Sequence, residues 1–261
     1  MSALSLRDAV VEIGGTTILK AVSFDVAPGQ LVGLLGPNGA GKTTAIRALI
    51  GSQSLLSGSA QIAGQDTKTF SARDRALALS YLPQSRQLVW PMCVRDVVAL
   101  GRFAFGGPLG RLGPHDAIAV DDALRRCDLA ALANRSVASL SGGETARVHI
   151  ARALAADTPA LIVDEPIAAL DPRHALDVLS LLKDRSRDGA AVLVILHDLS
   201  LAAQFCDEVI VLHGGSVATQ GPPIQALTPQ TLADVYDVAA RWDGPDLRVT
   251  GKCRSFSFRV D

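Results

Sequence analysis

A glycine-rich segment at residues 36–44 has the composition of a phosphate-binding loop. It reads GPNGAGKTT, fits the spacing G-x-x-x-x-G-K-[ST], and stands between the apolar run LVGLL and the helix-favouring stretch TTAIRALIG. Glycines let the backbone wrap closely around phosphates, with successive N–H groups pointing inward. A chance match occurs in about one chain of this size in a hundred, before that context is required. We expect Lys42 to bind the β- and γ-phosphates and Thr43 to ligate Mg²⁺. The predicted nucleotide contacts are Gly36, Pro37, Asn38, Gly39, Ala40, Gly41, Lys42, Thr43 and Thr44.

Two acidic residues, Asp164 and Glu165, follow a second apolar run in ALIVDEP at 160–166. Open α/β sheets bind ligands at the carboxyl ends of their strands, so these acids should face the phosphate loop. We expect Asp164 to hold the Mg²⁺ shell and Glu165 to orient or deprotonate an attacking water. The alternative is a strand that merely ends in solvated acids, and the presence of a phosphate loop in the same chain disfavours it.

Two further polar residues end strand-like runs and complete the predicted catalytic set. His197 follows VLVIL, on a strand expected to neighbour that of Asp164, and could reach a γ-phosphate. A lone histidine there is more often structural. Gln84 ends SYLPQ, and its amide can touch metal or water. The predicted catalytic residues are Glu165, His197, Gln84 and Lys42, and the predicted metal ligands are Thr43, Gln84 and Asp164.

A second candidate anion site is LSGGE, residues 140–144. Ser141, Gly142, Gly143 and Glu144 precede the helix-favouring ETARVHIARALAA, which predicts an exposed helix N-terminus. Free N–H groups and the positive end of the helix dipole suit such a terminus to hold an anion.

The composition is that of an ordinary globular protein. The 261 residues are 48% hydrophobic and 20% charged, with net charge −1, which disfavours disorder and general nucleic-acid binding. Four scattered cysteines favour a reducing compartment over a disulfide framework. We see no secretory signal, and no apolar run is long enough to span a bilayer. Neither Asn-Lys-x-Asp nor G-x-G-x-x-G occurs, which disfavours guanine and dinucleotide binding.

The pattern of apolar residues predicts an α/β fold. The runs 31–35, 160–163 and 192–196 read as buried parallel strands, and LSLRDAVVEI with ILKAVSFDV as an antiparallel pair joined near Gly14-Gly15. We expect a single domain over 1–261. Its α/β core would be 1–84 and 157–221, with a helical insertion at 85–156 and a helical tail at 222–261 whose strand pair falls within 246–260.

Together these motifs resemble the ATP-binding cassette family over nearly the whole chain: GPNGAGKTT looks like its Walker A loop, LIVDE its Walker B strand, LSGGE its signature, and ALD, ending at Asp171, its D-loop. Gln84 looks like the Q-loop glutamine and His197 the switch histidine. The resemblance implies ATP and Mg²⁺ as ligands and a head-to-tail homodimer, in which LSGGE holds the partner's γ-phosphate. Asp171 is then a nucleotide contact, and so is Ile13, which stands where the family usually has an aromatic residue stacked on adenine. The family's glutamine-rich stretch after the signature reads TAR here.

Residues 75–102 and the stretch GPPIQALTPQTLADVYDV are similar to importer cassettes for iron–siderophore complexes, haem and cobalamin. The resemblance implies an ATPase subunit at the cytoplasmic face of the inner membrane, with separate permease subunits docking near Arg86 to Arg102 and, indirectly, a solute-binding protein. An exporter cassette and a soluble mechanical ATPase of this family are the alternatives. No nucleic-acid partner is expected.

Overall fold

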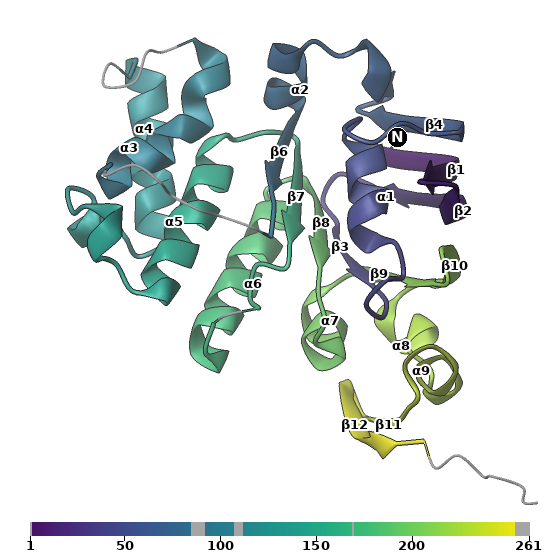
Figure 1. The fold of residues 1–261 in the computed structure, drawn as a ribbon. Helices are drawn as coiled ribbons and strands as arrows, with labels where there is room; N and C mark the ends of the chain where they lie inside the picture. Colours follow the sequence, from purple (N-terminus) through teal and green to yellow (C-terminus); the bar gives the residue numbers. More distant parts are fainter. Residues whose placement is uncertain (1, 85–91, 107–111, 169, 254–261) are drawn as a thin grey trace, which may run out of the picture.

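The computed structural model describes the chain except residues 1, 85–91, 107–111, 169 and 254–261. A six-stranded sheet forms the centre, in the order β10-β9-β3-β8-β7-β6 (Figure 1). Strands β6, β7, β8, β3 and β9 run parallel, and β10 pairs antiparallel with β9. Their bounds are β3 Leu31–Leu35, β6 Leu79–Leu82, β7 Ala160–Asp164, β8 Ala191–Ile195, β9 Glu208–His213 and β10 Ser216–Gly221. The expected parallel core is confirmed.

A second sheet holds the N-terminal strands, in the order β2-β1-β4-β5. The turn between its first two strands is made by Gly14 and Gly15, both with positive φ (60° and 79°), which two-residue hairpin turns favour. The predicted antiparallel pair is therefore confirmed, whereas the two strands that complete the sheet were not predicted. The bounds are β1 Leu4–Ile13, β2 Thr16–Val26, β4 Ser57–Ile62 and β5 Gln65–Asp66.

Helices cover the large sheet and extend from its β6 edge. α1 lies between the two sheets, and a helical segment projects beyond β6 (Figure 1). The helices are α1 Lys42–Leu49, α2 Ala72–Ala78, α3 Val94–Ala99, α4 Pro114–Arg126, α5 Gly142–Ala155, α6 Pro172–Arg187, α7 Leu199–Phe205, α8 Pro223–Ala226 and α9 Pro229–Tyr236. In the described part of the chain, none of them combines the length and the apolar character needed to span a bilayer.

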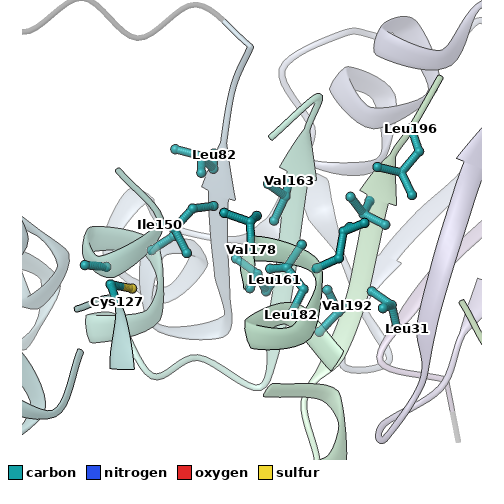
Figure 2. Close-up of a cluster of buried hydrophobic side chains, with 14 of the residues drawn as sticks. Leu31, Leu82, Cys127, Ile150, Leu161, Val163, Val178, Leu182, Val192 and Leu196 are labelled. Atoms are coloured by element: carbon teal, nitrogen blue, oxygen red, sulfur yellow. The ribbon is translucent and has the colours of Figure 1, made fainter. Parts of the chain in front are cut away.

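The apolar faces predicted for the helical segment are buried. Val94, Val97, Val120 and Leu124 are each no more than 1% exposed and belong to the same cluster as the sheet residues Leu82 and Val163. Figure 2 shows this cluster, in which strands of the sheet meet side chains of α5 and α6 such as Ile150 and Val178. The helical segment therefore shares one hydrophobic core with the six-stranded sheet.

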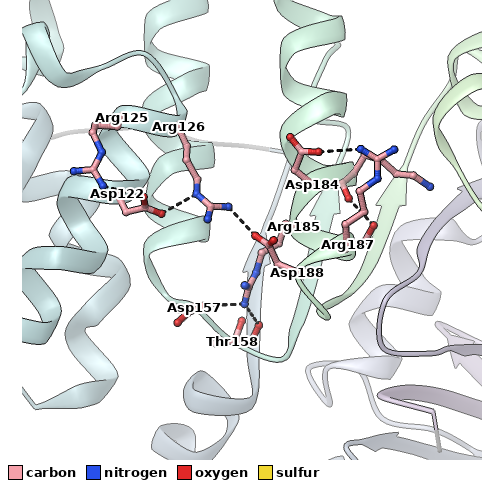
Figure 3. Close-up of polar contacts among 11 residues, drawn as sticks. Asp122, Arg125, Arg126, Asp157, Thr158, Asp184, Arg185, Arg187 and Asp188 are labelled. Atoms are coloured by element: carbon pink, nitrogen blue, oxygen red, sulfur yellow. Dashed lines mark hydrogen bonds and ion pairs between the residues drawn. The ribbon is translucent and has the colours of Figure 1, made fainter.

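Ion pairs also join the helical segment to α6. Arg126 of α4 bonds Asp188 at 2.9 Å, and Arg185 of α6 bonds Asp157 at 3.0 Å and the carbonyl of Thr158 at 2.8 Å (Figure 3). Arg126 and Asp188 come from opposite sides of the junction, whereas Arg185 binds the short segment that leads from α5 into β7. Because most of these side chains are exposed, their contribution to stability is about 0–1 kcal/mol each.

The C-terminal strand pair lies earlier than expected. β11 Val238–Asp243 pairs with β12 Asp246–Lys252, whereas the sequence suggested a pair within 246–260, of which 254–260 are outside the described residues. Asp237 ends α9 in the left-handed conformation (φ 56°), and Gly244 (φ 60°) makes the turn of the hairpin. The left-handed backbone of Asp237 ends α9 before residue 238, so the first strand can begin there. Gly244 then places the hairpin turn before Asp246.

Candidate active site

The phosphate loop runs from the end of β3 to the start of α1, the context that its motif requires. Gly36 and Gly41 have φ of 143° and 102°, a region that disfavours side chains. A β-carbon on Gly36 would lie 2.3 Å from the Leu212 carbonyl oxygen, and one on Gly41 would lie 2.7 Å from a methyl carbon of Leu19. Both glycines are therefore required by sterics, and the loop is packed against β9 and β2.

The Lys42 side chain folds back over this loop. Its ammonium donates to the carbonyl oxygens of Gly36 (2.6 Å) and Pro37 (3.1 Å), and the residue is 7% exposed. Burial lowers the pKa of Lys42, while the negative charges of Glu165 and Asp164 act in the opposite direction. The two acids predicted from ALIVDEP are thus close enough to influence the lysine, as their position at the strand end requires.

Asp164 is the last residue of β7 and is only 1% exposed. Tyr81 of the neighbouring strand β6 pairs in register with Ile162, two residues before Asp164, which puts Tyr81 and Asp164 on the same face of the sheet. Burial, the charge of Asp164 and a hydrogen bond to its carboxylate raise the pKa of Tyr81. The sequence analysis missed Tyr81, because its contact depends on strand register rather than on any motif.

Glu165 connects three strand ends. One carboxylate oxygen accepts from Nε2 of Gln84 at 2.5 Å, and the other lies 2.5 Å from Nε2 of His197. These partners follow β6 and β8, the two strands that flank β7. Glu165 has φ of 50°, a conformation uncommon outside glycine and frequent at functional sites. Three of the four residues predicted to be catalytic, Glu165, Gln84 and His197, therefore meet at one carboxylate, whereas Lys42 bonds the phosphate loop.

The residues available for Mg²⁺ are few. Among the residues that the structure describes, no group of three or more histidine, cysteine, aspartate or glutamate side chains could hold a metal ion. Of the predicted ligands, Thr43, in the first turn of α1, offers a hydroxyl, and Asp164 offers a carboxylate. Gln84 offers its amide oxygen, because its amide nitrogen donates to Glu165. Mg²⁺ bound with a nucleotide normally takes one or two carboxylates and completes its shell with phosphate oxygens and water. The donor set fits such an ion and does not form a separate metal cage.

LSGGE forms the N-terminus of α5, as the sequence predicts. The Ser141 hydroxyl accepts from the Glu144 amide at 3.2 Å, and the Glu144 carboxylate accepts from the Ser141 amide at 2.8 Å, a capping box. The bond from the Ser141 amide, together with a hydrogen bond from the Ser141 side chain to the carboxylate, lowers the pKa of Glu144. The amides of Gly142 and Gly143 lie in the first turn, where helix N–H groups have no intrahelical acceptor. Figure 1 shows α5 separated from α1 by strands of the large sheet.

Asp171 caps the next helix, α6. Its carboxylate accepts from the backbone N–H of His174 at 3.1 Å and lies 2.6 Å from the Nδ1 atom of that histidine. These two hydrogen bonds lower the pKa of Asp171. Ala169, in the same predicted D-loop, lies outside the described residues.

Ile13 ends β1 beside the hairpin turn and is 48% exposed, so it is accessible to a planar ligand. An aliphatic side chain lacks an aromatic stacking face. We predict that Ile13→Tyr tightens ATP binding by about 1 kcal/mol, the lower end of the range measured for base stacking, and sharpens the preference for ATP over GTP. Competition with a fluorescent nucleotide measures both, and Ile13→Leu is the aliphatic control. Unchanged affinities for Ile13→Tyr would mean that Ile13 does not contact the base.

The predicted docking segment is described only in part. Residues 86–91 lie outside the described residues, and Arg102 is buried, at 8% exposed. Arg102 bonds Asp116 at 2.8 Å and the last carbonyls of α5, at Ala155 and Ala156, at 3.1 and 3.3 Å. Its inclusion in a docking surface was wrong: the buried guanidinium joins α4 to the end of α5.

The C-terminal part of the chain also reaches the phosphate loop. Burial raises the pKa of Tyr236, the last residue of α9, and a hydrogen bond with the backbone of Gly36 opposes the shift. The hairpin of β11 and β12 packs on α7, where the Ser200 hydroxyl donates to the Leu247 carbonyl at 2.9 Å. No short motif marks these contacts in the sequence.

The amino-acid sequence is similar to those of known proteins. Residues 19–168 match the family described as ABC transporter. The chain is 42% identical over 227 residues to "Hemin import ATP-binding protein HmuV" of Streptomyces coelicolor, covering 87% of this chain and 80% of that protein. It is 40% identical over 228 residues to "Cobalamin import ATP-binding protein BtuD" of Halobacterium salinarum, covering 87% of this chain and 57% of that protein.

A solved structure has the same architecture. It is the dimeric post-hydrolysis state of the ATP-binding cassette MJ0796 bound to ADP and Pi, with a TM-score of 0.73 and 26% identity over 84% of this chain and 98% of that one. The family match covers more than half of the chain, and the HmuV similarity covers most of both proteins. The chain belongs to the ABC transporter family, and it is an ATPase cassette of that family.

Proposed function

We propose that this chain is the ATP-hydrolysing subunit of an importer for haem, an iron–siderophore complex or cobalamin. The observation that carries the hydrolytic part is the position of Glu165, held between Gln84 and His197 at the strand ends that face the phosphate loop. The names of the HmuV and BtuD relatives support import and the class of cargo.

Each site residue has a role in this proposal. The loop 36–44 wraps the phosphates, and Lys42 exchanges its carbonyl partners for the β- and γ-phosphate oxygens. Thr43, Gln84 and Asp164 would hold Mg²⁺, which neutralises charge on the phosphates when bound. Glu165 takes a proton from the attacking water, Gln84 orients that carboxylate, and His197 donates to the γ-phosphate. Ile13 packs on the base.

The second anion site serves a second copy of the chain. Ser141, Gly142, Gly143 and Glu144 form one helix end, separated from the chain's own α1 by strands of the large sheet. The capping box uses the amides of Ser141 and Glu144, so the amides of Gly142 and Gly143 and the Ser141 hydroxyl would bind the γ-phosphate held by a partner. Support for such a homodimer comes from the dimeric MJ0796 cassette bound to ADP and Pi. Closing the dimer on ATP and reopening it after hydrolysis then drives separate permease subunits. The cassette would lie at the cytoplasmic face of the inner membrane, with a solute-binding protein delivering cargo from the other side.

Reconstitution with a candidate permease in proteoliposomes tests this function. With the cassette and ATP outside, and the loaded solute-binding protein inside, an importer moves cargo out of the lumen, toward the ATP. Haemin, an iron–siderophore complex and cobalamin are compared as cargo, with Glu165→Gln as the inactive control. Movement of cargo away from the ATP would indicate an exporter. ATPase activity that no permease alters, together with absence from membranes, would indicate a soluble mechanical ATPase.

A further inference from the structure

His174 connects two functional loops within one chain. It lies in the first turn of α6, where Asp171 is the N-cap residue. One oxygen of the Asp171 carboxylate accepts from the His174 backbone N–H at 3.1 Å, and the other lies 2.6 Å from Nδ1 of its ring. The first bond caps the helix and needs no imidazole, because any residue at position 174 except proline supplies that N–H. The second bond is specific to the side chain.

The same imidazole ring also faces the signature loop. Gly143 has no side chain, but a β-carbon built on it would lie 3.8 Å from Nδ1 and 4.0 Å from Cε1 of His174, so the ring lies beside this glycine. Gly143 is in the first turn of α5, two residues after Ser141. The ring thus stands between the first turns of α5 and α6, at a cavity of about 570 Å³ that Arg147 and Asp177 also line. Its side chain is 33% exposed, whereas that of Asp171 is 58% exposed.

We propose that His174 is a positioning residue that fixes Asp171 and the signature loop relative to each other, so that both meet the partner chain as one preformed surface. This inference rests on the proposed head-to-tail dimer. Each loop is an exposed helix end, and fixing their relative position before association lowers the entropy lost when the dimer closes. His174 contacts no nucleotide in this arrangement.

The test compares variants in the Glu165→Gln background, where ATP-bound dimers should accumulate. Sedimentation measures the ATP concentration that gives half-maximal dimerisation, and a fluorescent nucleotide measures ATP affinity in dilute, monomeric protein. We expect His174→Ala to raise the first quantity about two- to tenfold, the cost of ordering one more side chain when the dimer closes, with the second unchanged. His174→Asn should recover much of the loss, because the asparagine amide can donate to Asp171.

A matched control is His115→Ala. His115 follows the proline that begins α4, is exposed, and lies outside both loops. It should dimerise like the Glu165→Gln parent. Hydrogen exchange adds a readout that needs no dimer: peptides covering 140–146 should exchange faster in His174→Ala than in the parent or in His174→Asn, while peptides covering 36–44 should not change.

Ser141→Ala separates this inference from the proposed function. If Ser141→Ala and His174→Ala both need more ATP to dimerise, both ideas are supported. If Ser141→Ala is impaired and His174→Ala is not, the positioning role is wrong and the dimer stands. If Ser141→Ala dimerises normally, or if no variant dimerises with ATP, the proposed dimer is wrong. The positioning role is then wrong as well, because it depends on that dimer. Unchanged exchange at 140–146 in His174→Ala also overturns the positioning role.

Discussion

Glu165→Gln is expected to slow ATP hydrolysis by about 10²–10⁴-fold, the usual effect of losing a positioned general base. Glutamine has nearly the same shape, so it can still accept a hydrogen bond from Gln84, but it cannot take a proton from water. ATP binding should persist because Lys42 and the phosphate loop are unchanged. The variant should therefore accumulate as an ATP-bound dimer. Single-turnover hydrolysis and sedimentation with ATP measure the two effects.

The matched control for this carboxylate is Asp198→Asn. Asp198 directly follows His197, caps α7 through a 2.9 Å bond from the Leu201 amide, and is exposed. Asparagine is an equally good capping residue, so this variant should hydrolyse ATP at nearly the normal rate. A near-normal rate for Glu165→Gln would instead mean that another group serves the water.

The second large effect concerns the trans role of Ser141. Lys42→Ala removes a cation from the chain's own phosphate site, and Ser141→Ala removes a hydroxyl offered to the partner's site. Each homodimer then has two damaged sites. Losing one preorganised donor costs about 2.7–4 kcal/mol, so both variants should hydrolyse ATP about 10²–10³-fold more slowly.

Mixing the two inactive proteins should recover part of the rate. In the mixed dimer, Lys42 of the Ser141→Ala chain meets Ser141 of the Lys42→Ala chain, which restores one intact site, while the other site carries both lesions. Steady-state ATPase of the mixture measures recovery, with the permease present if dimerisation requires it. A tagged pull-down shows subunit exchange, and a heterodimer with one wild-type site shows whether a single site can act. If both controls succeed and the mixture stays inactive, Ser141 does not serve its partner.

The centre of the fold could be predicted because its strands are buried on both faces. Leu31–Leu35 and Ala160–Asp164 are almost wholly apolar, and such short runs followed by helical patterns are typical of parallel sheets. The motif residues at the ends of these strands were then placed by topology. Lys42, Asp164, Glu165 and His197 could be assigned to one sheet edge for that reason.

Other elements depend on contacts that no local pattern records. The link from Tyr81 to Asp164 requires the register between β6 and β7, and the proximity of His174 to Gly143 requires two helix ends to lie side by side. The short helix α2 did leave a signal: Ser71 accepts from the Asp74 amide at 3.1 Å, a capping pattern visible in the sequence as S-x-x-D. The C-terminal hairpin was misplaced because its boundaries depend on the left-handed backbone of Asp237 rather than on strand propensity.

The bonds from the Lys42 ammonium to the carbonyls of Gly36 and Pro37 affect how nucleotide affinity should be understood. The lysine is already satisfied by its own loop, so arrival of a phosphate is an exchange of acceptors and not a new attraction. The donor is the charged ammonium in both states, so the gain is only the difference between a charged acceptor and two neutral ones. Measured affinity therefore understates the strength of the lysine–phosphate contact. In the proposed cycle the ammonium would return to its carbonyls after product release, which would give the loop a defined resting state.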